Sequence, residues 1–344
     1  MRHLTRPGDF DSFLPGEHGT PWAPPRPRLP VAVDGLPGDR LSGDRRRPEK
    51  VKVLITGGSS GIGAATAEAF AARGGYQVAV TGRDQAALAK VAGATGGVSI
   101  PGDLREHGSP RRVVDAAAAA LGGLDVVVSN AGVGWAGMFT AMTDDEMDEL
   151  LDVNLRAPAH VAHAALSHLR PGTGRLVFVG SIAGLLGVAG ETWYSATKAG
   201  VTMLADVLRA ELRGEEIGLS LVIPGVVATP YFDRRNLPYQ RRFPRPIAAQ
   251  LVADAIVDAV EHRRDTVIVP EWLGWPARLK GAFPALYRRL ERTLDSEGRN
   301  STDGGSTNGG STNGGSSTGG RWHGGGKWHG GKRAPVVGST GTWP

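Results

Sequence analysis

Three side chains that can move a proton or bind an oxygen lie between positions 181 and 198 of the sequence. Tyr194 and Lys198 are four residues apart in a segment, residues 192–212, whose apolar residues recur at helical spacing, so both lie on one helix face. An ammonium near a phenol favours the phenolate and lowers the pKa of the tyrosine from about 10. Ser181 follows the apolar run 176–179, so we expect its hydroxyl at the end of a buried strand. The set predicts proton exchange with a substrate oxygen that Ser181 also binds.

A spacing of four between tyrosine and lysine is common in packed helices, so the surrounding elements must support this interpretation. Residues 51–55 read V-K-V-L-I, a strand pattern, and continue into T-G-G-S-S-G-I-G at 56–63 and an alanine-rich helix over 64–73. Gly57 permits the tight turn, Gly61 lets the backbone approach a diphosphate, and Gly63 lets the helix pack on the strand. The helix N-terminus then offers free N–H groups to the phosphates. This order of elements predicts a dinucleotide site.

The end of the second strand, residues 77–81, bears on the choice of dinucleotide. An acidic residue at this point usually binds the ribose hydroxyls of NAD, but here the position holds Gly82, followed by Arg83. A guanidinium suits the 2′-phosphate of NADP, which it can bind through two hydrogen bonds. Asp84 is the competing candidate, and a helix N-cap before residues 85–91 explains it more simply. We therefore favour NADP over NAD.

The rest of the central region alternates apolar strands with helical segments. Further strands are expected over 98–101, 124–129, 176–180, 219–223 and 266–269, and helices over 111–121, 192–212 and 248–261. Residues 143–146, T-D-D-E, form a capping box that opens a helix containing Asn154. The alternation predicts an α/β fold, a Rossmann-type doubly wound parallel sheet of seven strands in a single domain. Every polar motif follows a strand, where ligands bind in such sheets.

The two ends of the 344-residue chain differ from its middle. Residues 1–49 are rich in Pro and Arg and read as a disordered extension. Residues 50–270 form the dinucleotide-binding domain, 271–294 an amphipathic segment, and 295–344 a disordered Gly/Ser/Thr/Asn-rich tail. In that tail His323 and His329 are not expected to form a specific metal site.

Charge and composition exclude several classes of function. Residues 1–50 carry nine Lys/Arg against seven Asp/Glu and residues 295–344 five against three, which leaves +1 of the formal +5 for the middle. The basic balance is therefore no argument for a nucleic-acid partner. Cysteine is absent, which excludes disulfides and thiolate metal sites. Without an apolar run of about 18 residues or the apolar core of a secretion signal, we expect a cytoplasmic protein.

Taken together, the motifs over residues 50–270 resemble those of the short-chain dehydrogenase/reductase family. They are T-G-x-x-x-G-x-G at 56–63, Asp103, N-A-G at 130–132, Asn154, Ser181, Y-x-x-x-K at 194–198 and P-G at 224–225. The resemblance implies an NAD(P)-dependent oxidoreductase with Tyr194 as acid/base, Ser181 at the substrate carbonyl, and Lys198 on the nicotinamide ribose and lowering the pKa of Tyr194. It also implies that Asn154 holds a water that links Lys198 to solvent.

The resemblance also assigns the residues around the cofactor. It implies that Asp103 and Leu104 contact the adenine, that Asn130 steadies the neighbouring strand, and that Val227 and Thr229 orient the carboxamide. The complete set of implied cofactor-binding residues is Gly57, Ser59, Ser60, Gly61, Ile62, Gly63, Arg83, Asp103, Leu104, Asn130, Ala131, Gly132, Tyr194, Lys198, Pro224, Gly225, Val227 and Thr229. No metal is implied.

The substrate is less well defined by the sequence. The apolar segment 182–188 favours a hydrophobic ketone, aldehyde or secondary alcohol, although Leu185 and Leu186 could instead pack inward. A 3-oxoacyl thioester reductase is the alternative enzyme, but such members of the family usually have asparagine where this chain has Trp193. A cofactor-binding sensor or scaffold without turnover is the alternative of another class. The intact Ser181–Tyr194–Lys198 set argues against it.

The segment that follows the last strand is both basic and amphipathic. Apolar residues recur every three or four positions over 272–290, arginines intersperse them, and Pro276 and Pro284 are expected to interrupt a single long helix. Packing over the active site or across a subunit interface is the plainer interpretation, and peripheral membrane contact through 272–292 is the other. The family resemblance implies a homodimer or homotetramer.

Overall fold

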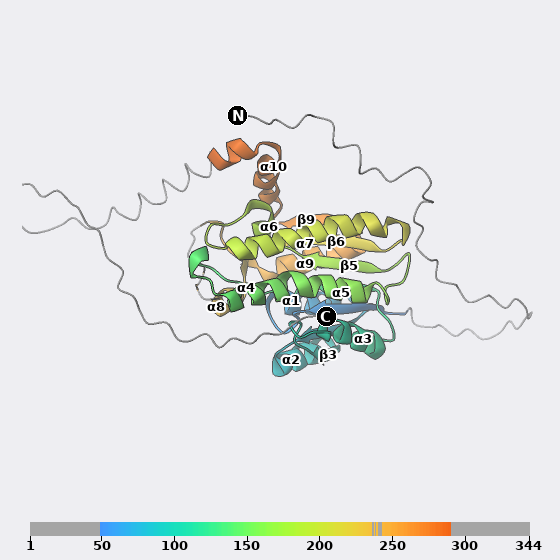
Figure 1. Cartoon of the computed structure of the whole chain (residues 1–344). Coiled ribbons are helices and arrows are strands. Elements are labelled where there is room, and N and C mark those ends of the chain that lie inside the picture. Colours follow the sequence, from blue (N-terminus) through green and yellow to red (C-terminus); the bar gives the residue numbers. More distant parts are fainter. Residues whose placement is uncertain (1–48, 236, 238, 240–242, 290–344) are drawn as a thin grey trace, which may run out of the picture. The chain divides into compact units, whose positions relative to one another are not determined.

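The computed structural model describes residues 49–235, 237, 239 and 243–289, and one seven-stranded sheet runs through its centre (Figure 1). Its strands are β1 (Val51–Thr56), β2 (Tyr76–Gly82), β3 (Val98–Pro101), β4 (Val126–Ser129), β5 (Arg175–Val179), β6 (Gly218–Pro224) and β9 (Thr266–Val269). Every neighbouring pair is parallel, in the order β3-β2-β1-β4-β5-β6-β9. The predicted doubly wound Rossmann-type fold is confirmed.

Helices cover both faces of the sheet, as the apolar strands require. One layer holds α1 (Gly61–Arg73), α2 (Gln85–Thr95) and α9 (Ala249–Glu261), and the other holds α3 (Ser109–Leu121), α5 (Ala157–Ala165) and α7 (Thr192–Glu211). Alternate residues of one strand serve the two layers: in β1, Val53 packs with the first layer and Leu54 with the second. The predicted N-cap of α2 is confirmed, because the Asp84 side chain accepts from the Ala87 N–H at 3.0 Å.

The sheet changes direction between β1 and β4. The chain runs outward from β1 through β2 to β3, then returns to β4 on the other side of β1 and continues to β9. In open parallel sheets the carboxyl ends of the strands at such a switch point form a ligand-binding crevice. The loops that follow β1, β4, β5 and β6 all begin at this edge.

The helix that carries Asn154 is less regular than its sequence pattern predicts. The capping box is confirmed: Thr143 caps α4 (Asp144–Leu151) and Glu146 reaches back to the Thr143 N–H at 2.8 Å. The helix then widens into a π-helical turn, η3 (Asp152–Arg156), before continuing as α5. A π turn inserts one residue into a helical ladder and is frequent at functional sites. It turns Asn154 into the interior, where the residue is fully buried.

Short elements complete the carboxyl edge of the sheet. They are η2 (Phe139–Ala141), α6 (Ile182–Leu186), η4 (Leu212–Gly214), β7 (Val227–Ala228), α8 (Tyr231–Arg234), β8 (Ile247–Ala248), η5 (Glu271–Leu273) and α10 (Gly274–Ala282). One expectation is corrected here. Pro276 does not interrupt a helix but lies in the first turn of α10. Backbone N–H groups in a first turn make no intrahelical hydrogen bond, so a proline is tolerated there.

Several sequence predictions fall outside the described residues, namely the extension 1–48, the tail 295–344 and the histidines at 323 and 329. Within the described part of the chain, no helix combines the length and apolar character that crossing a membrane requires.

Candidate active site

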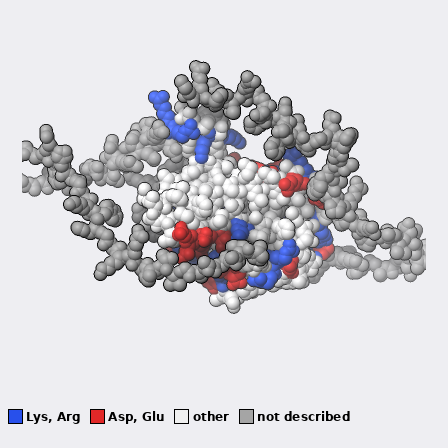
Figure 2. Space-filling view, in the orientation of Figure 1, with Lys and Arg blue, Asp and Glu red and all other residues white. Residues whose placement is uncertain are grey.

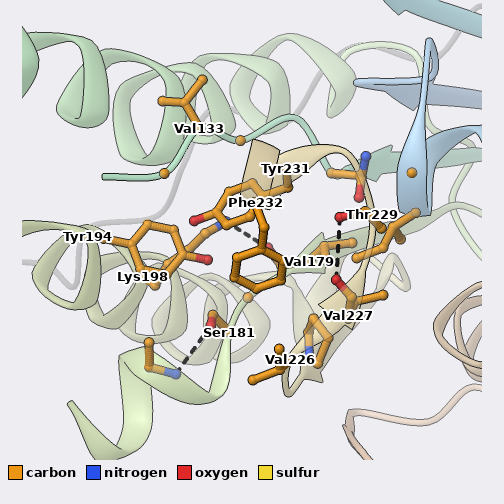
Figure 3. A pocket seen from close by; sticks show the side chains of 18 of the residues that line it. Val133, Val179, Ser181, Tyr194, Lys198, Val226, Val227, Thr229, Tyr231 and Phe232 are labelled. Carbon is orange, nitrogen blue, oxygen red and sulfur yellow. Dashed lines mark hydrogen bonds between the residues drawn. The ribbon is translucent and has the colours of Figure 1, made fainter. Parts of the chain in front are cut away.

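A cavity of about 970 Å³ opens at the carboxyl edge of the sheet, and it gathers nearly all of the predicted site residues (Figure 3). Those that line it are Gly57, Ser59, Ser60, Gly61, Ile62, Arg83, Asp103, Leu104, Asn130, Ala131, Gly132, Ser181, Tyr194, Lys198, Pro224, Gly225, Val227 and Thr229. The other two, Gly63 and Asn154, lie directly behind the wall and support it. Residues spread over about 170 positions of the sequence therefore converge on one space.

The glycine-rich loop has the shape that the sequence predicts for a phosphate cradle. Gly57 adopts a φ of +67°, which favours glycine, and its Cα lies against Ala131 of the neighbouring loop. A side chain at Gly63 would approach the Gly57 carbonyl to 2.2 Å, so only glycine lets α1 start this close to β1. Asn130 fixes the loop from the other side, because its Nδ2 donates to the Thr56 carbonyl at 2.9 Å. Open backbone at the start of α1 fits a dinucleotide diphosphate.

Three of the four predicted catalytic side chains meet on the opposite side of the cavity. Ser181 ends the loop after β5 and begins α6, where its Oγ accepts from the Ala183 N–H at 3.2 Å. Its hydroxyl also lies near Tyr194 and lowers the pKa of that phenol. Lys198, one turn further along α7, is buried and donates from Nζ to the Val179 carbonyl at 3.2 Å. A serine and a tyrosine hydroxyl therefore face the same small volume, which is an arrangement that can bind one substrate oxygen.

Burial dominates the pKa values of both Tyr194 and Lys198. It raises the pKa of the Tyr194 phenol, while the nearby hydroxyls of Tyr231 and Ser181 oppose that rise. Burial also lowers the pKa of the Lys198 ammonium from its ordinary 10.5 to about 8. That Lys198 lowers the pKa of Tyr194 stays a prediction.

Asn154 contacts backbone groups rather than the cavity. Its Oδ1 accepts from the Val133 N–H and its Nδ2 donates to the Val133 carbonyl, both at 2.9 Å. A side chain at Gly132 would lie 3.2 Å from Asn154 Oδ1 and 3.5 Å from Lys198 Nζ, so this glycine leaves room for both polar groups. The observed role of Asn154 is to hold the loop after β4, and a relay of protons through it stays a prediction.

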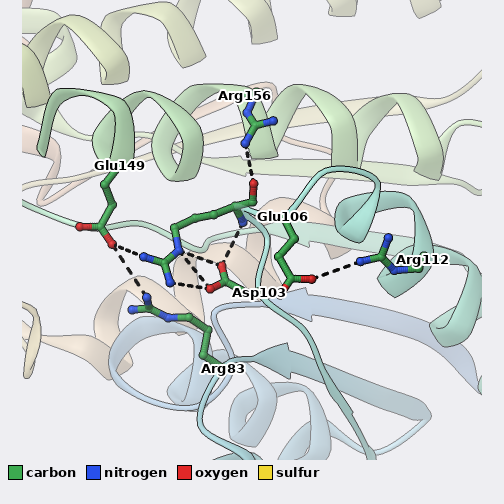
Figure 4. Close-up of polar contacts among 7 residues, drawn as sticks. Arg83, Asp103, Glu106, Arg112, Glu149 and Arg156 are labelled. Atoms are coloured by element: carbon green, nitrogen blue, oxygen red, sulfur yellow. Dashed lines mark hydrogen bonds and ion pairs between the residues drawn. The ribbon is translucent and has the colours of Figure 1, made fainter. Parts of the chain in front are cut away.

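At the other end of the cavity, charged residues form a connected network (Figure 4). Arg105 binds both carboxylate oxygens of Asp103, with its Nη2 at 2.6 Å from Oδ2, and this contact lowers the pKa of the Asp103 carboxyl. Glu149 of α4 pairs with Arg105 at 2.9 Å and lies 3.8 Å from Arg83. Arg83 is thus positioned at the end of β2 as predicted, and half of its side chain is exposed. Sequence reasoning missed Arg105 and Glu149, which no motif marks.

The residues after Thr229 bring a second tyrosine to the catalytic group. Tyr231, the first residue of α8, lies beside Tyr194, and the two ring centroids are 6.0 Å apart. Its hydroxyl lies against Gly134, where an added Cβ would come within 2.2 Å of the oxygen. Burial and proximity to Tyr194 raise the pKa of Tyr231 well above its ordinary value. This contact could not be predicted from the sequence, because residues 230–246 lack a periodic pattern.

A buried ion pair fastens α8 to the start of α7. Arg235 donates from Nη1 to Glu191 Oε1 at 2.7 Å, and only 5% of the arginine side chain is exposed. The same guanidinium stacks over Phe232, 4.7 Å from the ring centroid. Arg235 therefore joins the end of α8 to the start of α7 inside the protein.

The half of the cavity beyond Tyr194 is predominantly apolar. Val133, Leu186, Val188 and Phe232 line it, together with Leu273, Pro276, Leu279 and Tyr287 from the C-terminal segment. Lys280 holds that segment in place by donating to the carbonyls of Leu185 and Leu186, the last residues of α6, at 3.0 and 2.7 Å. The inner face of α10 therefore packs over the cavity, in agreement with the interpretation that this segment covers its own active site.

The outer face of the same segment is exposed. The Trp275 side chain is 72% exposed and stacks with Arg278, and Phe283 is 60% exposed. Figure 2 shows lysine and arginine side chains gathered over α10. Contact of this face with a membrane, or with another subunit, stays a prediction.

Trp193 points away from the cavity. Its Nε1 donates to the Met147 carbonyl of α4 at 2.8 Å, and its ring packs with Trp135, Met142 and Leu150. The bulk of this residue therefore does not narrow the space around Tyr194. The objection that Trp193 raises to an acyl-thioester substrate loses weight for this reason.

Comparisons with known proteins agree with this geometry. The sequence profile described as short chain dehydrogenase matches residues 51–239. The ketoacyl reductase HetN of Nostoc sp. is 34% identical over 228 residues, which are 63% of this chain and 77% of that protein. The 3-oxoacyl-[acyl-carrier-protein] reductase MabA of Mycobacterium tuberculosis is 33% identical over 178 residues, which are 52% of this chain and 69% of that protein.

Solved structures show the same fold with nicotinamide cofactors bound. A short chain dehydrogenase from Burkholderia cenocepacia in complex with NADP has a TM-score of 0.57 and 32% identity, covering 65% of this chain and 97% of that one. A short chain dehydrogenase/reductase from Burkholderia phymatum in complex with NAD has a TM-score of 0.62 and 25% identity, covering 69% and 95%.

Proposed function

The chain belongs to the short-chain dehydrogenase family and is an oxidoreductase that uses a nicotinamide cofactor, and we propose that it acts on a hydrophobic ketone, aldehyde or secondary alcohol with NADP(H). The observation that carries the proposal is the convergence of two sets of residues on one cavity. The glycine-rich loop forms one wall, and Ser181, Tyr194 and Lys198 form another. The space between them extends into an apolar compartment.

Each residue of the site would have a separate role in the reaction. The bound nicotinamide supplies or accepts the hydride. The hydroxyls of Ser181 and Tyr194 hold the substrate oxygen, and Tyr194 gives it a proton during reduction or removes one during oxidation. Lys198 lies one turn from Tyr194 along α7, and its ammonium, cationic below its pKa of about 8, would bind the nicotinamide ribose. Asn154 steadies the loop that carries Gly132 beside them.

The preference for NADP rests on the residues at the end of β2. Arg83 lines the cavity there, and a side chain at Gly82 would lie 3.4 Å from Ser59 Oγ. A guanidinium and a hydroxyl beside open backbone suit a 2′-phosphate. Glu149 already engages Arg83 at 3.8 Å, so a phosphate would compete with that carboxylate.

Steady-state kinetics with a panel of apolar and polar carbonyl compounds would test the proposal. NADPH oxidation should be fastest with apolar ketones, and NADH should support lower rates. Tyr194→Phe should abolish turnover while leaving NADPH binding intact, because only the proton-transfer group is removed. Equal rates with NADH would contradict the NADP preference. A Tyr194→Phe protein that retains full activity would contradict the assignment of the acid/base.

A second candidate substrate is a 3-oxoacyl thioester. It is supported by two relatives, the ketoacyl reductase HetN and the 3-oxoacyl-[acyl-carrier-protein] reductase MabA, and by the position of Trp193 outside the cavity. Both candidates use the same proton transfer and differ in the group attached to the carbonyl. An acyl-thioester substrate that exceeds the best simple ketone in kcat/KM would select the second candidate.

A further inference from the structure

Arg234 ends α8 and reaches across to the glycine-rich loop. Its Nη1 donates to Ser60 Oγ at 3.1 Å, and both residues line the cavity. Ser60 immediately precedes α1, so the guanidinium lies where the loop turns into that helix. A side chain from the substrate half of the site therefore contacts the half that the cofactor uses.

Contacts on either side of Arg234 hold it in this position. Thr229 packs on the loop, because a side chain at Gly61 would lie 3.2 Å from its Cβ. On the other side, Arg235 is fixed to Glu191 by the buried ion pair. The backbone of α8 is thus held before and after Arg234, and the exposed side chain reaches the glycine-rich loop through its hydrogen bond to Ser60.

The positive charge around Arg234 favours the binding of an anion. Arg83, Arg105 and Arg235 each pair with a carboxylate, whereas no carboxylate among the described residues pairs with Arg234. The first turn of α1 carries no acidic residue, and the helix N-terminus adds its own partial positive charge. A cation placed against a helix N-terminus is unfavourable unless an anion lies between them.

We propose that Arg234 is a cofactor-binding residue whose guanidinium binds the diphosphate of the nicotinamide dinucleotide. The inference rests on the cofactor part of the proposed function and adds a ligand from α8 to it. The diphosphate would lie between the N-terminus of α1 and Arg234, which would exchange its bond to Ser60 for bonds to phosphate oxygens. NAD and NADP share the diphosphate, so Arg234 acts on both, whereas Arg83 acts only on the 2′-phosphate.

Equilibrium binding of NADPH and NADH to four proteins tests this difference. The proteins are the wild type, Arg234→Gln, Arg83→Gln and Arg245→Gln, the last being an exposed arginine of the same segment outside the cavity. Arg234→Gln should raise the Kd of both cofactors about tenfold, the loss expected for one charge-assisted contact. Arg83→Gln should raise the Kd of NADPH alone, and Arg245→Gln should change neither.

Competition by fragments separates a direct contact from a general disturbance of the fold. ADP keeps the diphosphate and adenosine lacks it, so Arg234→Gln should weaken ADP about tenfold and leave adenosine unchanged. Equal loss for both fragments would mean a distorted site and would overturn the inference. Wild-type affinities in Arg234→Gln, or a loss confined to NADPH, would also overturn it. A wild type that binds neither NADPH nor NADH would instead overturn the proposed function itself.

Discussion

The ring of Tyr231 lies 6.0 Å from that of Tyr194, measured between centroids, although the two residues lie on different elements and 37 positions apart. The Tyr231 hydroxyl is one of the two hydroxyls that lower the pKa of Tyr194 against the rise that burial imposes. A neighbouring hydroxyl can donate a hydrogen bond to the Tyr194 phenolate, whereas an apolar ring cannot. Tyr231 therefore helps to set the pH at which Tyr194 exchanges its proton.

We predict that Tyr231→Phe shifts the pH profile of alcohol oxidation to higher pH. Oxidation needs the Tyr194 phenolate, and losing a hydrogen bond to that form raises the pKa of Tyr194, so the midpoint of the rising limb moves up. Rates measured across the alkaline range would show the shift. Tyr239→Phe is the matched control, because its hydroxyl donates to the Pro244 carbonyl at 2.8 Å. An unchanged profile in Tyr231→Phe would contradict the prediction.

Lys198→Met should stabilise the protein at neutral pH while removing activity. Burial lowers the pKa of Lys198 from 10.5 to about 8. Between these values the unfolded state binds more protons than the folded state, so stability rises with pH there, and the full penalty, about 3 kcal/mol, applies below pH 8.

Urea unfolding at neutral pH and near pH 10 would measure the effect. The stability gain of Lys198→Met over the wild type should be largest at neutral pH and shrink as pH approaches the unfolded pKa. A wild type that is more stable than Lys198→Met at neutral pH would show that hydrogen bonding to Val179 outweighs desolvation.

The Arg235–Glu191 pair should be strongly coupled. Only 17% of the Glu191 side chain is exposed, and Arg235→Met would leave its carboxylate without a partner. This substitution alone should therefore lower the free energy of unfolding by about 3 kcal/mol. The double variant Glu191→Gln/Arg235→Met should be less destabilised than the sum of the two single variants, by about 1–3 kcal/mol. Denaturant unfolding of the four proteins would measure the coupling energy. Additive effects would mean that Phe232 stacking, rather than the ion pair, fastens Arg235.

Glu149→Gln should favour NADPH over NADH more strongly than the wild type does. Glu149 Oε1 lies 3.8 Å from Arg83 Nη1, so its charge competes with a 2′-phosphate for the guanidinium. Because both side chains are partly exposed, solvent screening limits the expected gain to about two- to fivefold in Kd for NADPH. Asp148→Asn, an exposed acid one position earlier, should leave the ratio of the two Kd values unchanged. A weaker affinity for NADPH in Glu149→Gln would mean that Glu149 orients Arg83.

The sequence predicted those parts of the site that local patterns encode. The strands, the glycine-rich loop and the capping box depend on residues that are neighbours in the chain, and each was located to within a few positions. The contacts of Tyr231, Arg234 and Arg235 could not be predicted, because they join an aperiodic segment to elements far away in sequence. The effect of burial on the pKa of Tyr194 could not be predicted for a related reason: helical spacing places Lys198 near Tyr194, but desolvation depends on how the whole core packs.

The π-helical turn at Asp152–Arg156 makes the chain between α4 and α5 sensitive to its length. A regular α-helix advances about 100° per residue, so deleting one residue from this turn would rotate everything that precedes it relative to α5. Asn154 would then lose its two hydrogen bonds to the Val133 backbone. Single-residue deletions scanned from Glu149 to Ala157 should therefore be tolerated worst within the turn, although most of its residues carry no chemistry.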